Sequence, residues 1–175
     1  MSSDNPFGAD NQQERPDIAQ WVVGFVDGEG CFSVPIFRNK TCKLGWQVQP
    51  EFSVVQGVKS VDVLHLLKLF FQCGYVGRNG RHDNHREDLY RFNVRLIADL
   101  SDRIIPFFKV NPLRTAKQED FAKFSDVVEI MLEGHHLRKE GIERIAAIAS
   151  TMNRRKPSRY LESSEAIRQP SQVDA

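Results

Sequence analysis

Between residues 16 and 37 the hydrophobic pattern changes abruptly from the spacing of a helix to that of a strand. Pro16 and Asp17 suit a helix start, because proline is tolerated in the first turn and an acid complements the helix dipole. Apolar residues then recur at helical spacing as far as Val26, and from Phe32 they occupy every second position. The chain must therefore end a helix and begin a strand near the segment 28–30, where glycine suits a C-terminal cap.

The same reasoning predicts four strands in two pairs. Strands over 31–37 and 46–54 flank a polar turn, and strands that begin at Gly74 and span 90–94 flank a polar hairpin. Helices are expected at 59–72, 97–107, 116–134 and 138–152. This order predicts an α+β domain with the arrangement αββαββα plus C-terminal helices. Its four-stranded antiparallel sheet would have helices on one face and a polar, free opposite face.

Composition sets the domain limits and excludes several classes. We expect a disordered N-terminal tail over 1–15, one domain over 16–155, and a basic, then polar, tail over 156–175. No apolar run reaches the roughly 18 residues that span a bilayer, which predicts a soluble, intracellular protein. The three cysteines are odd in number and widely spaced, so neither a disulfide framework nor a structural zinc site is indicated.

The charge is unevenly distributed although its net value is only +1. Residues 1–30 carry one Lys or Arg against six Asp or Glu, a balance of −5, and residues 31–95 carry ten against five, a balance of +5. A further basic run, RRKPSR, occupies 154–159. It is either a solvated tail or a phosphate contact.

The end of the first helix carries the most informative residues. Gly24 and Gly28 are four positions apart, so they share one helical face, where a second helix can approach closely. Glu29 stands at the C-terminal end, where free carbonyl oxygens add to its carboxylate. Hard cations such as Mg²⁺ prefer such oxygen ligands, which makes Glu29 and Gly28 the predicted metal-binding residues.

The segment Gly24-Phe25-Val26-Asp27-Gly28-Glu29-Gly30 closely resembles the last seven positions of the LAGLIDADG motif of homing endonucleases. The predicted order of elements over 16–155 also matches that family. The resemblance implies that two motif helices pack at a two-fold axis and that Glu29 of each binds a divalent ion. Only one motif is present, which implies a homodimer with Trp21, Gly24 and Gly28 in the interface.

Two further active-site residues follow from the resemblance. Gln56, at the end of the second strand, takes the place of a water-positioning polar residue, although it is also a plausible turn residue. Lys117 is the best candidate for a basic residue that neutralises charge in the transition state, with Lys109 and Arg114 as alternatives. Asp27 takes an acidic position that looks structural. The histidines at 82 and 85, and the adjacent pair at 135 and 136, make poor metal ligands.

The polar sheet face is expected to lie in the major groove of double-stranded DNA, which admits a two-stranded ribbon. The outward side chains are the candidate base readers: Ser33, Asn39, Gln47, Gln49, Ser53, Arg78, Arg91, Asn93 and Arg95. The candidate phosphate contacts are Arg38, Lys40, Lys43 and Arg81, together with Arg154, Arg155, Lys156 and Arg159.

The resemblance thus implies a Mg²⁺-dependent, site-specific endonuclease that cuts both strands of a long, nearly palindromic target and leaves 3′ hydroxyls and 5′ phosphates. Mn²⁺ or Ca²⁺ are alternative occupants of the metal site. An intron-associated homing role is expected, in a bacterial cytoplasm or an organelle matrix. An RNA-binding intron maturase and a DNA-binding transcription regulator on the same fold are the alternatives, and a pure binder would not need the carboxylate of Glu29.

Overall fold

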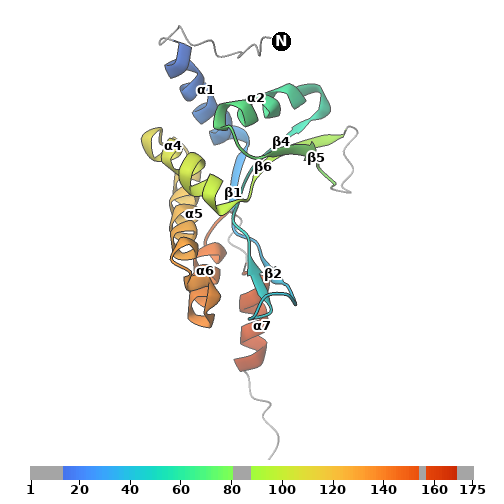
Figure 1. Cartoon of the computed structure of the whole chain (residues 1–175), viewed down its shortest axis with the longest axis vertical. Helices are drawn as coiled ribbons and strands as arrows, with labels where there is room; N and C mark the ends of the chain where they lie inside the picture. The colour runs from blue at the N-terminus through green and yellow to red at the C-terminus, as the bar shows by residue number, and fades with distance from the viewer. Residues whose placement is uncertain (1–13, 81–87, 154–156, 169–175) are drawn as a thin grey trace, which may run out of the picture.

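The computed structural model describes residues 14–80, 88–153 and 157–168. A four-stranded antiparallel sheet has the order β1-β4-β6-β5, and β2 pairs with β3 in a separate ribbon (Figure 1). The strands are β1 (Gly30–Ser33), β2 (Ile36–Arg38), β3 (Trp46–Val48), β4 (Glu51–Gly57), β5 (Tyr75–Arg78) and β6 (Leu89–Val94). The helices are α1 (Glu14–Glu29), α2 (Val61–Phe71), α3 (Ile97–Asp99), α4 (Ile105–Val110), α5 (Lys117–Leu132), α6 (Lys139–Ser150) and α7 (Arg159–Arg168), with short turns η1 (Val58–Ser60), η2 (Leu100–Ile104) and η3 (His135–Leu137).

Helices cover one face of the four-stranded sheet, as the sequence predicts. Phe32 of β1 and Phe52 of β4 stack at 5.0 Å between ring centroids, and both contact Phe108 of α4. Phe124 of α5 packs against Phe32 at 5.3 Å. On the same side, Phe71 of α2 lies against Phe52. The α+β prediction is therefore confirmed, and the opposite face of the sheet is left open.

Two expected long strands are each divided into two. The prediction of one strand over 31–37 gives way to β1 and β2, and that of one strand over 46–54 gives way to β3 and β4. A proline stands at each break, Pro35 and Pro50, and proline has no amide hydrogen for the ladder. The amide of Gln49 still donates to the oxygen of Pro35 at 3.0 Å, so the two parts remain joined. The ribbon therefore extends beyond the sheet (Figure 1).

Two helical expectations need correction. The helix predicted over 97–107 extends to Val110 and contains a π-helical turn, η2, just before Pro106, which cannot donate to the preceding turn. Part of the expected C-terminal tail instead forms α7, whose Tyr160 is buried against Trp46 of the ribbon. That contact joins residues far apart in the chain, so it cannot be predicted from a local sequence pattern.

No helix in the described parts of the chain is long and apolar enough to cross a membrane. Arg81, His82 and His85 lie outside the described residues, as do Arg154, Arg155 and Lys156.

Candidate active site and nucleic-acid interface

Helix α1 passes into β1 without a connecting loop. Glu29 is the last residue of the helix and Gly30 the first of the strand. A Cβ atom on Gly30 would lie 2.6 Å from Cγ1 of Val26 and 2.8 Å from its main-chain oxygen, so only glycine fits this junction. The junction leaves Glu29 exposed at the C-terminal end of α1.

Lys117 reaches this helix end from the first position of α5. Its ammonium nitrogen donates hydrogen bonds to the main-chain oxygens of Val26 and Asp27, each at 2.8 Å. Partial burial lowers the pKa of Lys117, while the negative charges of Asp27 and Glu29 act in the opposite direction. The amine thus occupies carbonyl groups that the helix leaves free, next to Glu29.

The carboxylate of Asp27 binds the segment that leads into α5. It accepts hydrogen bonds from the amides of Arg114 and Thr115, at 2.6 and 3.2 Å, and from the Thr115 hydroxyl at 2.7 Å. Burial raises the pKa of the Asp27 carboxyl, but these hydrogen bonds and the charge of Lys117 outweigh it and hold the pKa below its usual value. Asp27 and Lys117 together fasten α1 to α5.

Gln56 lies at the same end of the sheet. Val54 pairs with Gly30, so the two residues that follow Val54 continue past the start of β1, beside the end of α1. Gln56 is half-buried and pairs with Tyr90 of β6. The structure therefore brings the predicted residues Glu29, Gln56 and Lys117 to one end of α1. Lys109, in contrast, lies exposed on α4.

One face of α1 is only partly covered by the other described residues, because Phe25 packs against the core while Trp21 is exposed. Trp21 and Phe25 stack on it at 5.1 Å, and Trp21 is 39% exposed. A Cβ added at Gly24 or Gly28 would meet nothing within 4 Å. A smooth, partly aromatic surface therefore leads along the helix to Glu29.

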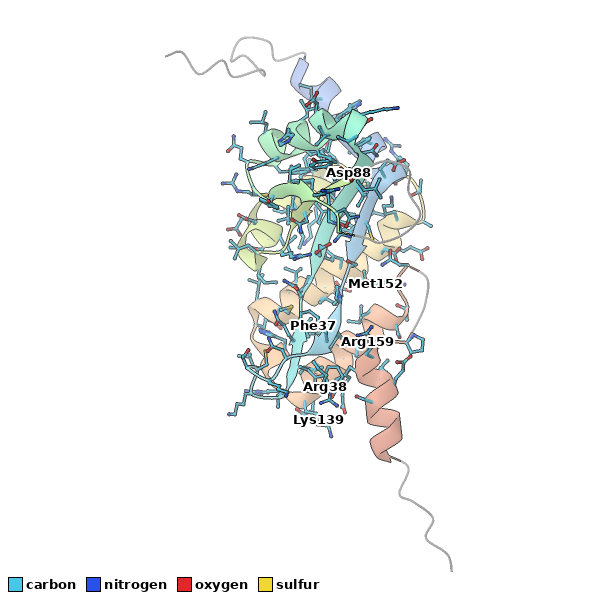
Figure 2. The ribbon with its side chains drawn as sticks, turned by 90° about the vertical axis from the view of Figure 1, so that its right-hand side faces the viewer. Phe37, Arg38, Asp88, Lys139, Met152 and Arg159 are labelled. Carbon is cyan, nitrogen blue, oxygen red and sulfur yellow. The ribbon has the colours of Figure 1, made fainter. Side chains whose placement is uncertain are left out.

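The open face of the sheet carries most of the candidate base readers. Figure 2 looks onto this face, with α5 and α6 behind the strands. Paired residues in an antiparallel sheet point to the same side, so Ser33, Ser53, Arg91 and Asn93 share the open face with Glu51. The Glu51 carboxylate binds Arg91 and Arg95.

Several candidate readers lie differently from the expectation. Arg78 pairs with Tyr90, which faces the helices, so Arg78 is on the other side of the sheet from Arg91, and it binds Asp88 instead. Ser53 is on the expected face but only 6% exposed. Sequence analysis missed Tyr75, which pairs with Asn93 and is 67% exposed on the open face. Tyr75 is the first residue of β5 and follows Gly74, so the sequence around it shows no alternation from which its facing could be predicted.

The ribbon carries the remaining candidates. Arg38 stacks its guanidinium 4.1 Å from the ring centre of Trp46, on the side that faces α7, so it is not simply an outward phosphate contact. The side chain of Asn39 donates to Gln47 at 2.6 Å. Gln49 is half-buried, while Lys40, Lys43 and Arg159 are exposed. Figure 2 shows Arg38 near the tip of the ribbon and Arg159 at the start of α7.

Comparison with known proteins identifies the class to which this fold and site belong. The model of the LAGLIDADG endonuclease family matches residues 22–128. Probable intron-encoded endonuclease 3 of Neurospora crassa is 35% identical over 138 residues, which are 78% of this chain and 25% of that protein. Homing endonuclease I-ApeII of Aeropyrum pernix is 30% identical over 69% of this chain and 68% of its own length. The chain belongs to the LAGLIDADG endonuclease family, and the resemblance seen in the sequence is confirmed.

Solved structures agree with this assignment. The homing endonuclease I-TnaI matches with a TM-score of 0.76 and 43% identity over 86% of this chain and 97% of that chain. I-SmaMI, bound to an uncleaved DNA target in the presence of calcium ions, matches with a TM-score of 0.77 and 30% identity over 90% of this chain and 51% of that chain. The chain thus spans nearly all of I-TnaI, about half of I-SmaMI, and about a quarter of the Neurospora relative.

Proposed function

We propose that this protein is a site-specific DNA endonuclease that cleaves both strands of a long, nearly two-fold-symmetric duplex. The observation that carries the proposal is the position of Glu29, an exposed carboxylate at the C-terminal end of α1, where the ammonium group of Lys117 also binds. Membership of the family and the DNA-bound state of the neighbour I-SmaMI support DNA as the substrate.

The active unit in this proposal is a homodimer joined along α1. Glu29 is one carboxylate at the end of one α1, and cleavage of two strands needs two such carboxylates. Packing two α1 helices at Trp21, Gly24 and Gly28 places two Glu29 carboxylates side by side, one for each DNA strand. I-SmaMI, of which this chain covers 51%, is long enough for two such domains in one chain, which supports the pairing.

The ion proposed for the site is Mg²⁺, with Mn²⁺ or Ca²⁺ able to occupy it. The exposed carboxylate of Glu29 and the carbonyl end of α1, including Gly28, supply oxygen donors, which fit a hard cation. Because Lys117 already occupies the oxygens of Val26 and Asp27, Glu29 is the main anionic ligand. The bound ion would lower the pKa of water and stabilise charge on the scissile phosphate.

The protein's own side chains supply the remaining chemistry. The two carbonyl oxygens fix the ammonium group of Lys117, so it can offer positive charge to the transition state without reorganising. The amide of Gln56 would orient the attacking water from the adjacent end of β4.

The open sheet face and the ribbon would bind the major groove, with exposed Lys40, Lys43 and Arg159 on phosphates. The intron-encoded relatives support a homing role. The expected location remains a bacterial cytoplasm or an organelle matrix.

The proposal is tested with the full chain and a library of randomised DNA duplexes. Incubation with Mg²⁺ should yield double-strand breaks at a defined sequence, with 3′ hydroxyl and 5′ phosphate ends. Glu29→Gln should abolish cleavage yet keep binding to the same sequence in Ca²⁺, because glutamine is nearly isosteric and only the charge is lost.

The matched control is Glu129→Gln, an exposed glutamate on α5 about 18 Å along that helix from Lys117, which should cleave normally. Sequence-specific binding without any cleavage by the wild-type protein would support a regulator instead. Preference for intron RNA over DNA would support a maturase.

A further inference from the structure

A buried carboxylate lies in the open face of the sheet, where a DNA-binding surface would be expected to carry positive charge. Glu51 is only 6% exposed. One of its oxygens accepts a hydrogen bond from Nη1 of Arg91 at 3.0 Å, and the other accepts from Nε of Arg95. Both oxygens of Glu51 are therefore directed to arginines, and the carboxylate is poorly placed to contact a base itself.

The sheet register shows that the two arginines reach Glu51 in different ways. Phe52 pairs with Val94, so Arg95 follows directly opposite Glu51. Arg91 pairs with Val55, four positions along β4 from Glu51. The Arg91 side chain must therefore run along the sheet past Ser53, and it is 27% exposed, whereas that of Arg95 is 47% exposed. Arg91 lies flat while Arg95 remains accessible.

The atoms that each arginine leaves free are also different. Nε of Arg91 is buried without a hydrogen-bond partner in the described part of the chain, which leaves that guanidinium little freedom to read a base. Arg95 uses Nε on Glu51, and no residue that the structure describes accepts a hydrogen bond from its two terminal nitrogens. Those two nitrogens form a fork that matches O6 and N7 of guanine in the major groove.

The charge of Glu51 is better explained by the orientation of the two arginines than by a contribution to DNA affinity. A carboxylate on a surface that binds a polyanion repels phosphate and weakens binding to every sequence alike. Orienting a planar guanidinium, by contrast, favours one base over the others, because a bidentate pair depends on the direction of the fork. A buried Glu51 with both oxygens on arginines fits the second effect.

We propose that Glu51 is a positioning residue that sets base preference, by holding Arg91 flat along the sheet and aiming the free edge of Arg95 at a guanine in each half of the target. The inference rests on the proposed function, since it requires site-specific DNA binding by the open face. It deepens that function by naming the base.

The experiment selects bound sequences from a randomised duplex library in Ca²⁺, with the wild-type protein, Glu51→Gln and Asp88→Asn. Asp88→Asn is a matched control: it also removes one carboxylate from an Arg–carboxylate pair. Its position is seven residues along the paired strands from Glu51, about 23 Å away, near the end of the sheet opposite the ribbon tip (Figure 2).

Wild-type protein and Asp88→Asn should both enrich guanine at one position of each half-site. Glu51→Gln should reduce that preference by about tenfold while binding unrelated duplexes as well as wild type or better, because a bidentate contact is lost and one negative charge is gone.

A second variant keeps the proposal testable if Glu51→Gln folds poorly in thermal unfolding. Arg95→Lys keeps the charge but loses the fork, so it should lose guanine preference at the same position. An Arg95→Lys profile equal to wild type, or a Glu51→Gln profile that changes no more than that of Asp88→Asn, overturns the inference and leaves the proposed function intact. If wild type enriches no sequence at all, the proposed function itself fails.

Discussion

The side chain of Lys117 binds the main chain at Asp27, and the side chain of Asp27 binds the main chain just before Lys117. The ammonium nitrogen of Lys117 lies 2.8 Å from the main-chain oxygen of Asp27, and the Asp27 carboxylate accepts hydrogen bonds from the two residues Arg114 and Thr115 that lead into α5. We refer to these contacts as the Asp27–Lys117 clasp. The clasp connects the helix that carries Glu29 to the helix that carries the basic group, so their relative position is fixed before DNA binds.

Replacing Lys117 should affect both activity and stability. Lys117→Met should lower the single-turnover cleavage rate by about 100-fold or more, because a fixed positive charge next to the scissile phosphate is lost. It should also lower the free energy of unfolding by about 1–2 kcal/mol, since two carbonyl oxygens lose their donor. Lys109→Met, on the exposed side of α4, is the control for both measurements. If the two variants cleave at equal rates, Lys117 is not the catalytic basic residue.

Asp27→Asn should loosen the clasp in a pH-dependent manner. At neutral pH the variant should unfold about 1 kcal/mol more easily in urea, because an amide cannot accept from all three donors. The folded-state pKa of Asp27 lies below its usual value of 3.8. The stabilisation is therefore fully present above that value and is lost as the pH falls through the lower, folded-state pKa. The difference between wild type and variant should shrink in urea titrations as the pH is lowered below 3.8; a constant difference would contradict the assignment.

Gly24→Leu separates assembly from folding. A side chain at this position meets nothing within 4 Å inside the domain, so the single domain should keep its fold, and its helix should gain about 0.5–1 kcal/mol in stability. The same side chain should block the close approach of a second α1. Sedimentation should show a dimer for wild type and for Glu129→Leu, which adds the same side chain at an exposed position of α5, but a monomer for Gly24→Leu. A wild-type monomer that still cleaves both strands would contradict the proposed assembly.

Tyr160 of α7 should stabilise the ribbon by packing against Trp46 of β3. Its ring packs edge-on against Trp46 at 5.1 Å and is 6% exposed, and a two-stranded ribbon alone is only marginally stable. Tyr160→Ala should lower the free energy of unfolding by about 2–4 kcal/mol and accelerate amide exchange in β2 and β3 more than in β4. Tyr160→Phe keeps the ring and should exchange almost as slowly as wild type. Uniform acceleration across both sheets would point to general destabilisation instead.

Local patterns in the sequence were sufficient for the facing of β6 and for the place where α1 ends. Alternation placed Phe92 and Val94 inward and Arg91 and Asn93 outward, because a strand repeats every two residues and one face is buried. Alternation failed in β5, where the Gly-Tyr-Val-Gly segment has no polar and apolar contrast, so Arg78 was assigned to the wrong side of the sheet. A glycine-rich strand gives little information on its facing.

Other features depend on contacts between distant residues. Three basic residues, Lys109, Arg114 and Lys117, were candidates. Only packing against α1 shows that the side chain of Lys117 binds the carbonyl groups of that helix end. Buried Glu51 binds Arg91 of β6 and Arg95 just after β6, which no spacing rule along β4 reveals. The fold of α7 depends on Trp46, more than a hundred residues earlier in the chain.

The loop-free passage from α1 into β1 restricts how this protein can diverge. If β1 contacts base pairs as proposed, a displacement of β1 that alters those contacts would also displace Glu29, because no loop separates the two elements at Gly30. Strand β5 lies at the opposite edge, separated from β1 by β4 and β6. New target sequences should therefore be acquired most readily through substitutions in β5 and in the ribbon, while β1 changes slowly. Engineering of altered specificity is best begun at Tyr75, far from the helix end.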